Sequence, residues 1–557
     1  MKNIITLQGY YDIFDDEPQL KESYLNGINK QVLIDYAMNY CSLSTIMGSD
    51  VNKILWPFFN TNDINTKFYK NLIIKISYIV RKGNGFPKIL NVRSSLKFFE
   101  LVQGREQLTY TNFSEQEIRQ KLFKVYLLLN SENKSVSNRK NLNEQIVETA
   151  LTFSIYSNVN CYFLRITELI KSCFFLEYCK EHIPFHFNVF LKNYGIDKWQ
   201  DYTLYLYQIG KIILDKNIEE PVKIISIPID DLDYAKKTAF FDKFCMQEIY
   251  QNDEDFTRIK SHPVIKNDKT AEYRIVFEQF FIEKTYKSLY FTFKEINDSF
   301  VGLDNYINKD QFRSDIGLKF SEKTLMNRIL KDALGNKYKQ LGYEKLKRDG
   351  NPDYYIRDGK HILLFECKDN LIGKKVIENA DIEKFIIELK HLFLNNKNGK
   401  PKAIKQIINN IVTIRKGEFI EDKGIDTNNN VIYPILITHN SILSLPGVNI
   451  LIDEWFFNEL DLLKVDKKNI KHLTIIDINT FILFQGLISK KGNTIRELID
   501  LYWKNYTRIE NKKYEKVEDV VDEFRIKYQS FNDFVENRYE VNSYIMKKLL
   551  KYDQYFS

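Results

Sequence analysis

The chain has 557 residues, of which 44% are hydrophobic and 28% are charged, a composition typical of a globular protein with two to four domains. Its formal net charge of +7 is too small to indicate a nucleic-acid partner by itself. No apolar run approaches the roughly 20 residues that span a bilayer, and the first segment turns acidic at Asp12, unlike the hydrophobic region of a signal peptide. We therefore expect a cytoplasmic protein that has no membrane partner.

Residues 1–250 are predicted to form a large all-α region. Ser114 and Glu117 are spaced as a capping box, and apolar residues follow from Ile118 at helical intervals. Residues 163–178 and 202–214 continue the helical pattern. We expect this region to regulate the rest of the chain or to recruit a protein partner.

Cysteine and histidine residues cluster within this first half. Cys173, Cys179, His182 and His186 are residue types that bind zinc. However, the six-residue spacing of the cysteines places them on different faces of a helix, and Pro184 separates the histidines. Two buried thiols and two histidines at helix ends are the favoured interpretation, with all six cysteines of the chain reduced.

Residues 251–310 are predicted to contain a linker and packing helices. The linker is expected in the charged segment 251–268, which includes His262 and Pro263. A third region, residues 311–485, is expected to carry the chemistry of the chain.

A β-hairpin is predicted in this third region, over residues 351–368. Two apolar runs flank Asp358-Gly359, the pair favoured in a type I′ turn, so Arg357 is expected to pair with Lys360. This register sets Asp353 opposite Leu364 and places Glu366 as its diagonal neighbour on the same face, with Cα atoms about 7–8 Å apart.

The acidic residues of this hairpin suggest a metal site. Asp353, Glu366 and the backbone carbonyl of Cys367 are oxygen donors of the kind that Mg²⁺ prefers, and Mn²⁺ could replace it. Lys368 shares the face of Glu366, where an ammonium group can orient a water molecule or stabilise charge on a phosphate. The alternative interpretation is an ordinary surface hairpin in which Asp353 caps a turn and Glu366 pairs with Lys368.

The segments after the hairpin alternate between helix and strand. Helices are predicted at residues 382–394 and 403–414, and strands at 431–438 and 473–477. A basic run that lacks acidic residues spans the two helices and could contact phosphates, or could simply be a solvated surface. Its candidate phosphate ligands are Lys390, Lys397, Lys400, Lys402 and Lys405. Residues 486–557 are expected to be a helical extension whose aromatic residues form a packing layer.

The order of helix, hairpin, helix and strand, with Pro352-Asp353 and then Glu366-x-Lys368, resembles the PD-(D/E)XK nuclease superfamily over residues 311–459. The resemblance implies a restriction-endonuclease-like α/β core in which Asp353 and Glu366 hold the metal and Lys368 is catalytic. It also implies that Glu322, on the preceding helix, and Gln406, on the following helix, join the site.

The fold class expected for the whole chain is therefore mixed, with an all-α N-terminal region, an α/β core and a helical C-terminal tail. The expected function is Mg²⁺-dependent cleavage of DNA, as an effector in restriction or phage defence, with a homodimer as one arrangement that would allow paired cuts. Two alternatives stay open: a non-catalytic nucleic-acid-binding or scaffold protein on a degenerate nuclease fold, and a ribonuclease toxin. The sequence contains no phosphate-binding loop of the Gly-x-x-x-x-Gly-Lys-Ser/Thr type, so ATP-driven activity is not expected.

Overall fold

The computed structural model describes residues 5–45, 51–81, 86–106, 112–133, 142–153, 160–214, 221–246, 256–267, 272–369, 372–488, 492, 494–508 and 526–539. Among these residues, no helix combines the length and the apolar character that a bilayer crossing requires.

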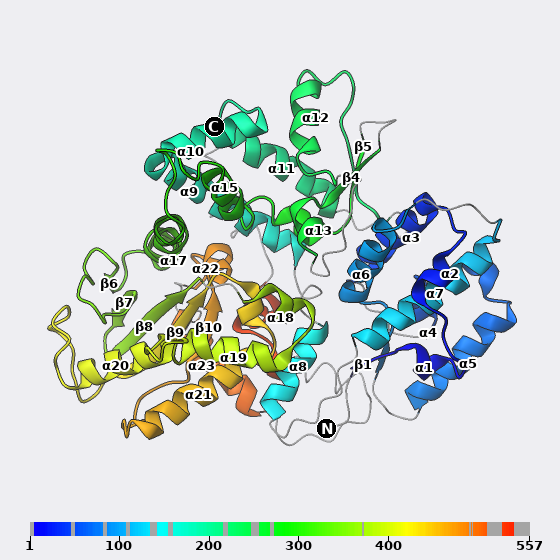
Figure 1. Cartoon of the computed structure of the whole chain (residues 1–557). Coiled ribbons are helices and arrows are strands. Elements are labelled where there is room, and N and C mark those ends of the chain that lie inside the picture. Colours follow the sequence, from blue (N-terminus) through cyan, green and yellow to red (C-terminus); the bar gives the residue numbers. More distant parts are fainter. Residues whose placement is uncertain are drawn as a thin grey trace.

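The first lobe is built mainly from helices (Figure 1). They pack around buried aromatic side chains. Its elements are β1 (Ile5–Leu7), α1 (Tyr10–Ile13), α2 (Lys21–Leu25), α3 (Lys30–Leu43), α4 (Val51–Leu55), η1 (Thr61–Asp63), α5 (Lys67–Arg81), β2 (Phe86–Lys88), α6 (Val92–Gln103) and α7 (Glu115–Glu132). The next helix, α8 (Leu142–Phe153), lies outside the lobe and packs against α19 (Ile382–Phe393) and α21 (Val448–Leu462). The predicted capping box is confirmed, because the backbone N–H of Ser114 donates to the Glu117 carboxylate at 2.8 Å and the Glu117 N–H donates to Ser114 Oγ.

A second group of elements follows in the chain, before the central sheet. It comprises α9 (Cys161–His182), α10 (Pro184–Tyr194), α11 (Trp199–Leu214), β3 (Ile224–Ser226), α12 (Tyr234–Asp242), α13 (Thr257–Ser261), β4 (Val264–Asn267), β5 (Glu272–Ile275), α14 (Glu278–Ile282), α15 (Leu289–Asp298), α16 (Lys309–Phe312), the π-helix η2 (Arg313–Leu325) and α17 (Met326–Leu334). Its helices α9 to α12 lie at the top of Figure 1.

One prediction for these regions is wrong. The N-terminal region is largely helical but not all-α, because β1 pairs with β2 and a three-stranded antiparallel sheet forms in the order β3-β5-β4. Within the predicted linker, residues 256–267 have regular structure: Phe256 and Ile259 are fully buried, and β4 pairs with β5. The rest of the predicted linker, residues 251–255 and 268, lies outside the described residues. Strands of three or four residues are too short for their side-chain alternation to stand out in a sequence.

The central sheet has five strands in the order β10-β9-β8-β7-β6. Its strands are β6 (Lys339–Leu341), β7 (Tyr354–Asp358), β8 (His361–Lys368), β9 (Val431–Thr438) and β10 (Thr474–Asp477). Strands β6, β7 and β8 are antiparallel neighbours, whereas β8, β9 and β10 run parallel, so the carboxyl ends of the last three meet at one edge. The sheet is therefore mixed, with parallel and antiparallel strands, and the strands predicted at 431–438 and 473–477 are confirmed as β9 and β10.

Helices cover both faces of this sheet (Figure 1). One face carries Ile362 and Leu364 against α18 (Lys374–Glu378), α19 (Ile382–Phe393), α20 (Ala403–Arg415) and α21 (Val448–Leu462). The other face carries Leu363 and Phe365 against η2, α17 and α22 (Ile478–Phe484). Because successive side chains of a strand point to opposite faces, both sides of β8 are apolar except at its carboxyl end.

The predicted hairpin forms, but its predicted register is wrong by two residues. Asp358 pairs with His361, so the two-residue loop is Gly359-Lys360 rather than Asp358-Gly359. Gly359 has φ +59° and Lys360 does not have positive φ, which is the pattern of a type II′ turn with glycine first, not of type I′. A shift of two residues keeps every side chain on its predicted face, since the side-chain period of a strand is two.

The C-terminal part forms a packing layer, as predicted. Helix α23 (Ile495–Arg508) and helix α25 (Phe531–Arg538) lie against β10 and α21 through buried Tyr502, Trp503 and Phe534. The indole N–H of Trp503 donates to Thr474 Oγ1 at 2.9 Å. Tyr514 and Phe524, also predicted to pack here, lie outside the described residues.

Candidate functional site

The carboxyl end of β8 holds two buried charged side chains on one face of the sheet. Glu366 is 3% exposed and Lys368 is 9% exposed, and Lys368 Nζ lies 2.8 Å from Glu366 Oε1. Residues at i and i+2 of a strand share a face, which is why the two side chains meet. Buried charges are costly unless they are paired, so this ion pair is the minimum that permits their burial.

Asp353 joins this pair from the neighbouring chain segment, directly before β7. Its backbone N–H donates to the carbonyl of Phe365 at 3.0 Å, and its Oδ2 accepts from the N–H of Cys367 at 2.7 Å. The β7–β8 ladder ends at the pair Tyr354–Phe365, so Asp353 lies just beyond it. Its bonds to Phe365 and Cys367, the two neighbours of Glu366, hold it beside Glu366.

The backbone carbonyl of Cys367 is directed toward Asp353. In an antiparallel ladder, the N–H and C=O of one residue leave the strand on the same side. The N–H of Cys367 reaches Asp353, and the β7–β8 ladder ends at the pair Tyr354–Phe365. The Cys367 carbonyl thus faces the side of Asp353, beyond the end of the ladder. The thiol of Cys367 is separate from this group: it is buried, and its Sγ lies 3.3 Å from His439 Nε2.

Crowding of acids raises their pKa values. Burial, followed by the charge of Asp353, raises the pKa of Glu366 to about 8, although Lys368 opposes the shift. Burial and the same aspartate raise the pKa of Glu322 to about 7. Burial also raises the pKa of Asp353 itself, against the charges of Lys368 and Lys323. The nearby acids in turn raise the pKa of Lys368, despite its burial. The cluster therefore has more carboxyl groups than one lysine neutralises.

A divalent cation is the natural partner for such an excess of carboxyl oxygens. Mg²⁺ commonly binds through one or two carboxylates and keeps several water molecules, so Asp353, Glu366 and the Cys367 carbonyl provide suitable donor chemistry. These donors do not include a third acidic, histidine or cysteine side chain: among the described residues, no group of three or more His, Cys, Asp or Glu is arranged to hold a metal ion. Glu322 is thus electrostatically coupled to the cluster without completing a three-acid group.

The structure places the two weaker sequence candidates on the elements that flank the hairpin. Glu322 lies on η2, and Ser321 beside it hydrogen-bonds to Asp369, directly after β8. Gln406 lies on α20, which packs on β8, and its Oε1 is buried without a hydrogen-bond partner among the described residues. An unsatisfied buried amide oxygen is uncommon and indicates an unfilled interaction.

The five lysines of the basic run are exposed or half-buried, and two of them contact side chains of α21. Lys405 Nζ lies 3.5 Å from Glu459 Oε2, and Lys390 Nζ lies 5.6 Å from the ring centre of Trp455. Lys397 and Lys400 are exposed, and Lys402 is half-buried. None of the five is among the charges that shift the pKa of Asp353 or Glu366.

A second basic group, which was not predicted from the sequence, lies nearer to the acids. Lys323 acts on the pKa of both Asp353 and Glu322, and its Nζ lies 2.9 Å from the hydroxyl of Tyr343. Lys319, Lys323 and Lys347 together lower the pKa of the exposed Tyr343 hydroxyl. The signal available in the sequence was the density of basic residues in 345–348, directly before Pro352-Asp353.

The cysteines and histidines considered as zinc ligands are not brought together. Cys173 and Cys179 are buried on α9. His182 Nδ1 lies 2.9 Å from the carbonyl of Tyr178, and His186 Nε2 lies 3.1 Å from Asn297 Oδ1. The two histidines therefore contact different parts of the molecule.

Comparisons of the chain with protein-family models, with curated proteins and with solved structures find no match. The arrangement of side chains around β8 is therefore the basis for any statement about function.

Proposed function

We propose that this chain is a divalent-metal-dependent nuclease that hydrolyses phosphodiester bonds, with DNA as the favoured substrate and its active site at the carboxyl end of β8. The observation that carries the proposal is the convergence of half-buried Asp353 with buried Glu366 and Lys368, together with the raised pKa values of the two acids. Strongly perturbed ionisable groups that cluster in this way are typical of functional sites. The resemblance to the PD-(D/E)XK superfamily assigns the same three residues.

Each residue has a role that follows from its position. Asp353, Glu366 and the Cys367 carbonyl would hold Mg²⁺ or Mn²⁺, which when bound polarises a phosphate and lowers the pKa of a bound water molecule. Lys368 has three N–H donors, of which one serves Glu366, so the others are suited to stabilise charge on phosphate oxygens. Glu322, with a pKa of about 7, can hold or release a proton near neutral pH.

Gln406 is suited to a positioning role, because its unpaired Oε1 can accept a hydrogen bond from a water molecule. Lys319, Lys323 and Lys347 surround the exposed Tyr343 near Asp353 and would contact the substrate backbone before the five lysines of the basic run.

The first lobe would restrain or target this site. Arg93 on α6 is buried and donates to the carbonyl of Ile377 at 2.7 Å, which connects the lobe to α18, the first helix after β8. A role as an effector of restriction or phage defence fits a nuclease that needs such restraint, and it rests on analogy of fold.

The decisive experiment incubates purified protein with plasmid DNA, linear DNA and RNA, with and without Mg²⁺ or Mn²⁺. We expect metal-dependent cleavage that Lys368→Ala lowers by about 10²–10³-fold, the usual cost of removing one electrostatic stabiliser of a transition state. Asp353→Asn is expected to abolish the response to metal.

The chain provides its own control for this test. Glu421-Asp422-Lys423 has the same tripeptide pattern as Glu366-Cys367-Lys368, and Lys423 is exposed. Lys423→Ala is expected to cleave like the wild type. Equal cleavage by the Lys368 and Lys423 variants would refute the proposal, and metal-independent binding without cleavage would favour a scaffold on a degenerate fold. Cleavage of RNA alone would favour the ribonuclease.

A further inference from the structure

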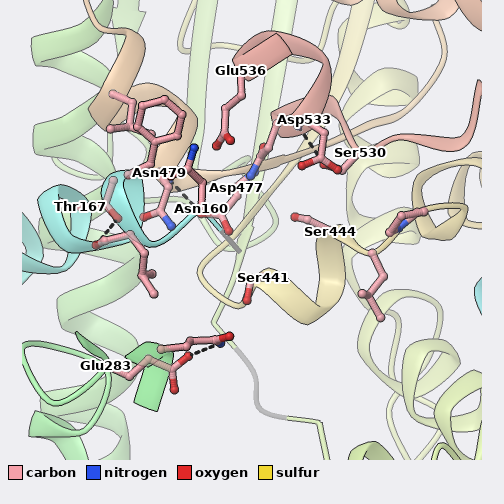
Figure 2. A pocket seen from close by; sticks show the side chains of 17 residues that line it. Asn160, Thr167, Glu283, Ser441, Ser444, Asp477, Asn479, Ser530, Asp533 and Glu536 are labelled. Carbon is pink, nitrogen blue, oxygen red and sulfur yellow. Dashed lines mark hydrogen bonds between the residues drawn. The ribbon is translucent and has the colours of Figure 1, made fainter. Parts of the chain in front are cut away.

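A hollow lined by acidic side chains lies beside the carboxyl end of β10, at the sheet edge that also carries the carboxyl end of β8 (Figure 2). It is a narrow hollow with a volume of about 100 Å³. Its wall comes from α9, α14, η3 (Ser441–Ser444), α22 and α25. In open α/β sheets, ligands characteristically bind beyond the carboxyl ends of parallel strands.

Every ionisable side chain that lines this hollow is acidic. The four are Glu283, Asp477, Asp533 and Glu536. Figure 2 shows Glu536 and Asp477 approaching each other from α25 and from the end of β10. Burial, followed by the charges of Asp533 and Asp477, raises the pKa of Glu536 to about 8. The acids thus repel one another across the hollow.

The nearby lysine side chains form ion pairs with Glu283 and Glu168. Lys287 Nζ lies 2.9 Å from Glu283 Oε1, and buried Lys171 pairs with Glu168 at 2.6 Å. Within the described part of the chain, neither Asp477 nor Glu536 has a basic side chain at ion-pair distance. Asp477 Oδ1 does accept the N–H of Asn479 at 2.8 Å, as the cap of α22.

Neutral acceptors in the wall are also unsatisfied. Gln279 is 4% exposed; its Nε2 donates to Glu283 at 2.8 Å, but its Oε1 has no partner among the described residues. The same holds for Asn479 Oδ1 and Ser444 Oγ, and all three side chains line the hollow. Buried oxygens without partners are rare, and these are available to accept hydrogen bonds from a ligand that enters the hollow.

Apolar side chains separate these polar groups. Phe163, Leu164, Leu445 and Leu483 line the hollow together with the acids and the unpaired oxygens. A single metal ion would not use such a wall, and no group of three or more acids among the described residues is arranged to hold one. A chain of methylene groups that carries amino groups at intervals matches both features.

We propose that this hollow binds a small aliphatic polyamine, a molecule with two or more protonated amino groups separated by methylene groups. Its amino groups would donate to Glu536, Asp477 and the unpaired oxygens, and its methylene groups would contact the leucine side chains. The site is distinct from the proposed nuclease centre. Lys368 and Asp477 both pair with Thr438, from its two sides, so their Cα atoms are about 10 Å apart, two strand spacings.

The test is calorimetric titration of the full-length protein with spermidine and with 1,5-diaminopentane, using 1,5-pentanediol as the uncharged analogue. We expect saturable binding of both amines at one site and no binding of the diol. Glu536→Gln is expected to weaken binding at least about tenfold, which is equivalent to 1.4 kcal/mol. Asp304→Asn, which removes an exposed acid elsewhere, should leave binding unchanged.

A loss of folding is distinguished by a second variant. Glu536→Lys places an ammonium group in the hollow, so it should abolish binding while keeping or raising the melting temperature. Equal affinity of the wild type and Glu536→Gln, or binding of the diol as strongly as of the diamine, would overturn the proposal. The readout is binding, so the result does not depend on whether the chain cleaves nucleic acid.

Discussion

The two ends of the β7–β8 hairpin bury acidic side chains in opposite electrostatic environments. Near the turn, Asp422 accepts hydrogen bonds from Arg357 at 2.6 Å, from Lys339 at 2.6 Å and from the Tyr355 hydroxyl at 2.9 Å. These partners hold the pKa of Asp422 well below its usual range, although burial opposes them. At the other end, Asp353, Glu366 and Glu322 share Lys368, and their pKa values rise.

This contrast separates a structural ion cluster from a candidate functional one. Burial is common to both ends, so burial by itself does not distinguish them. The balance of charge does: one acid has two cations near the turn, whereas several acids depend mainly on one lysine at the carboxyl end of β8. An acidic group that its own chain leaves underneutralised is suited to receive a cation from solution.

The largest expected effect is on stability at the turn end. Asp422→Ala would remove the acid that Arg357 and Lys339 share. Both cations are partly exposed, so solvent offsets part of the loss, and we expect a cost of about 2–3 kcal/mol, the upper range for hydrogen bonds to a charged group. Urea unfolding measures the loss. Asp426→Ala, in the same loop but exposed, should change stability by less than about 0.5 kcal/mol. Similar costs for both variants would contradict the assignment of a structural cluster.

The pH dependence of stability should differ in sign between the two ends. The pKa of Glu366 is raised from 4.5 to about 8, so its contribution is full below pH 4.5 and is lost as the pH rises through 8. The stability of the wild type relative to Glu366→Gln should therefore fall over this interval, by at least about 1 kcal/mol. The pKa of Asp422 is depressed, so its contribution is present at neutral pH and is lost on acidification below its ordinary value of 3.8.

Urea unfolding of the wild type, Glu366→Gln and Asp422→Asn across this pH range tests both signs. Parallel pH profiles for the two variants would remove the distinction between the ends of the hairpin.

A smaller effect is expected from Mg²⁺. A ligand that binds only the folded state stabilises it by about 1.4 kcal/mol at about ten times its dissociation constant. The melting temperature of the wild type should therefore rise with Mg²⁺, more at pH 8 than at pH 6, because Glu366 and Glu322 ionise in between. Asp353→Asn should lose the response, whereas Asp422→Asn should keep it. A response that is the same in all three proteins would indicate no metal site at Asp353.

The smallest expected effect concerns the interface between the first lobe and the core. Arg93→Ala removes the hydrogen bond to the Ile377 carbonyl, which is worth about 0.5–1.5 kcal/mol, so relief of restraint should raise cleavage by no more than about tenfold. Initial rates with a saturating DNA substrate measure it. A folded Arg93→Ala protein that cleaves at the rate of the wild type would argue against restraint through α18.

The sequence by itself determined which side chains share a face of the hairpin. Alternation along a strand fixes that Asp353, Glu366 and Lys368 lie together, and an error of two residues in the register leaves this result unchanged. Apolar periodicity likewise located α19, α20, β9 and β10 to within a residue or two. These features are local, because they depend on the periods of helices and strands.

Only the tertiary structure decided the register and the charge balance. Gly359 occupies the first turn position of a type II′ loop, where its positive φ is tolerated, and Leu364 consequently pairs with Tyr355 instead of Asp353. The proximity of Lys323 to Asp353, and of Asp477 to Glu536, joins segments far apart in the chain. Neutralisation of a buried acid depends on distance in space, which packing of the whole chain sets.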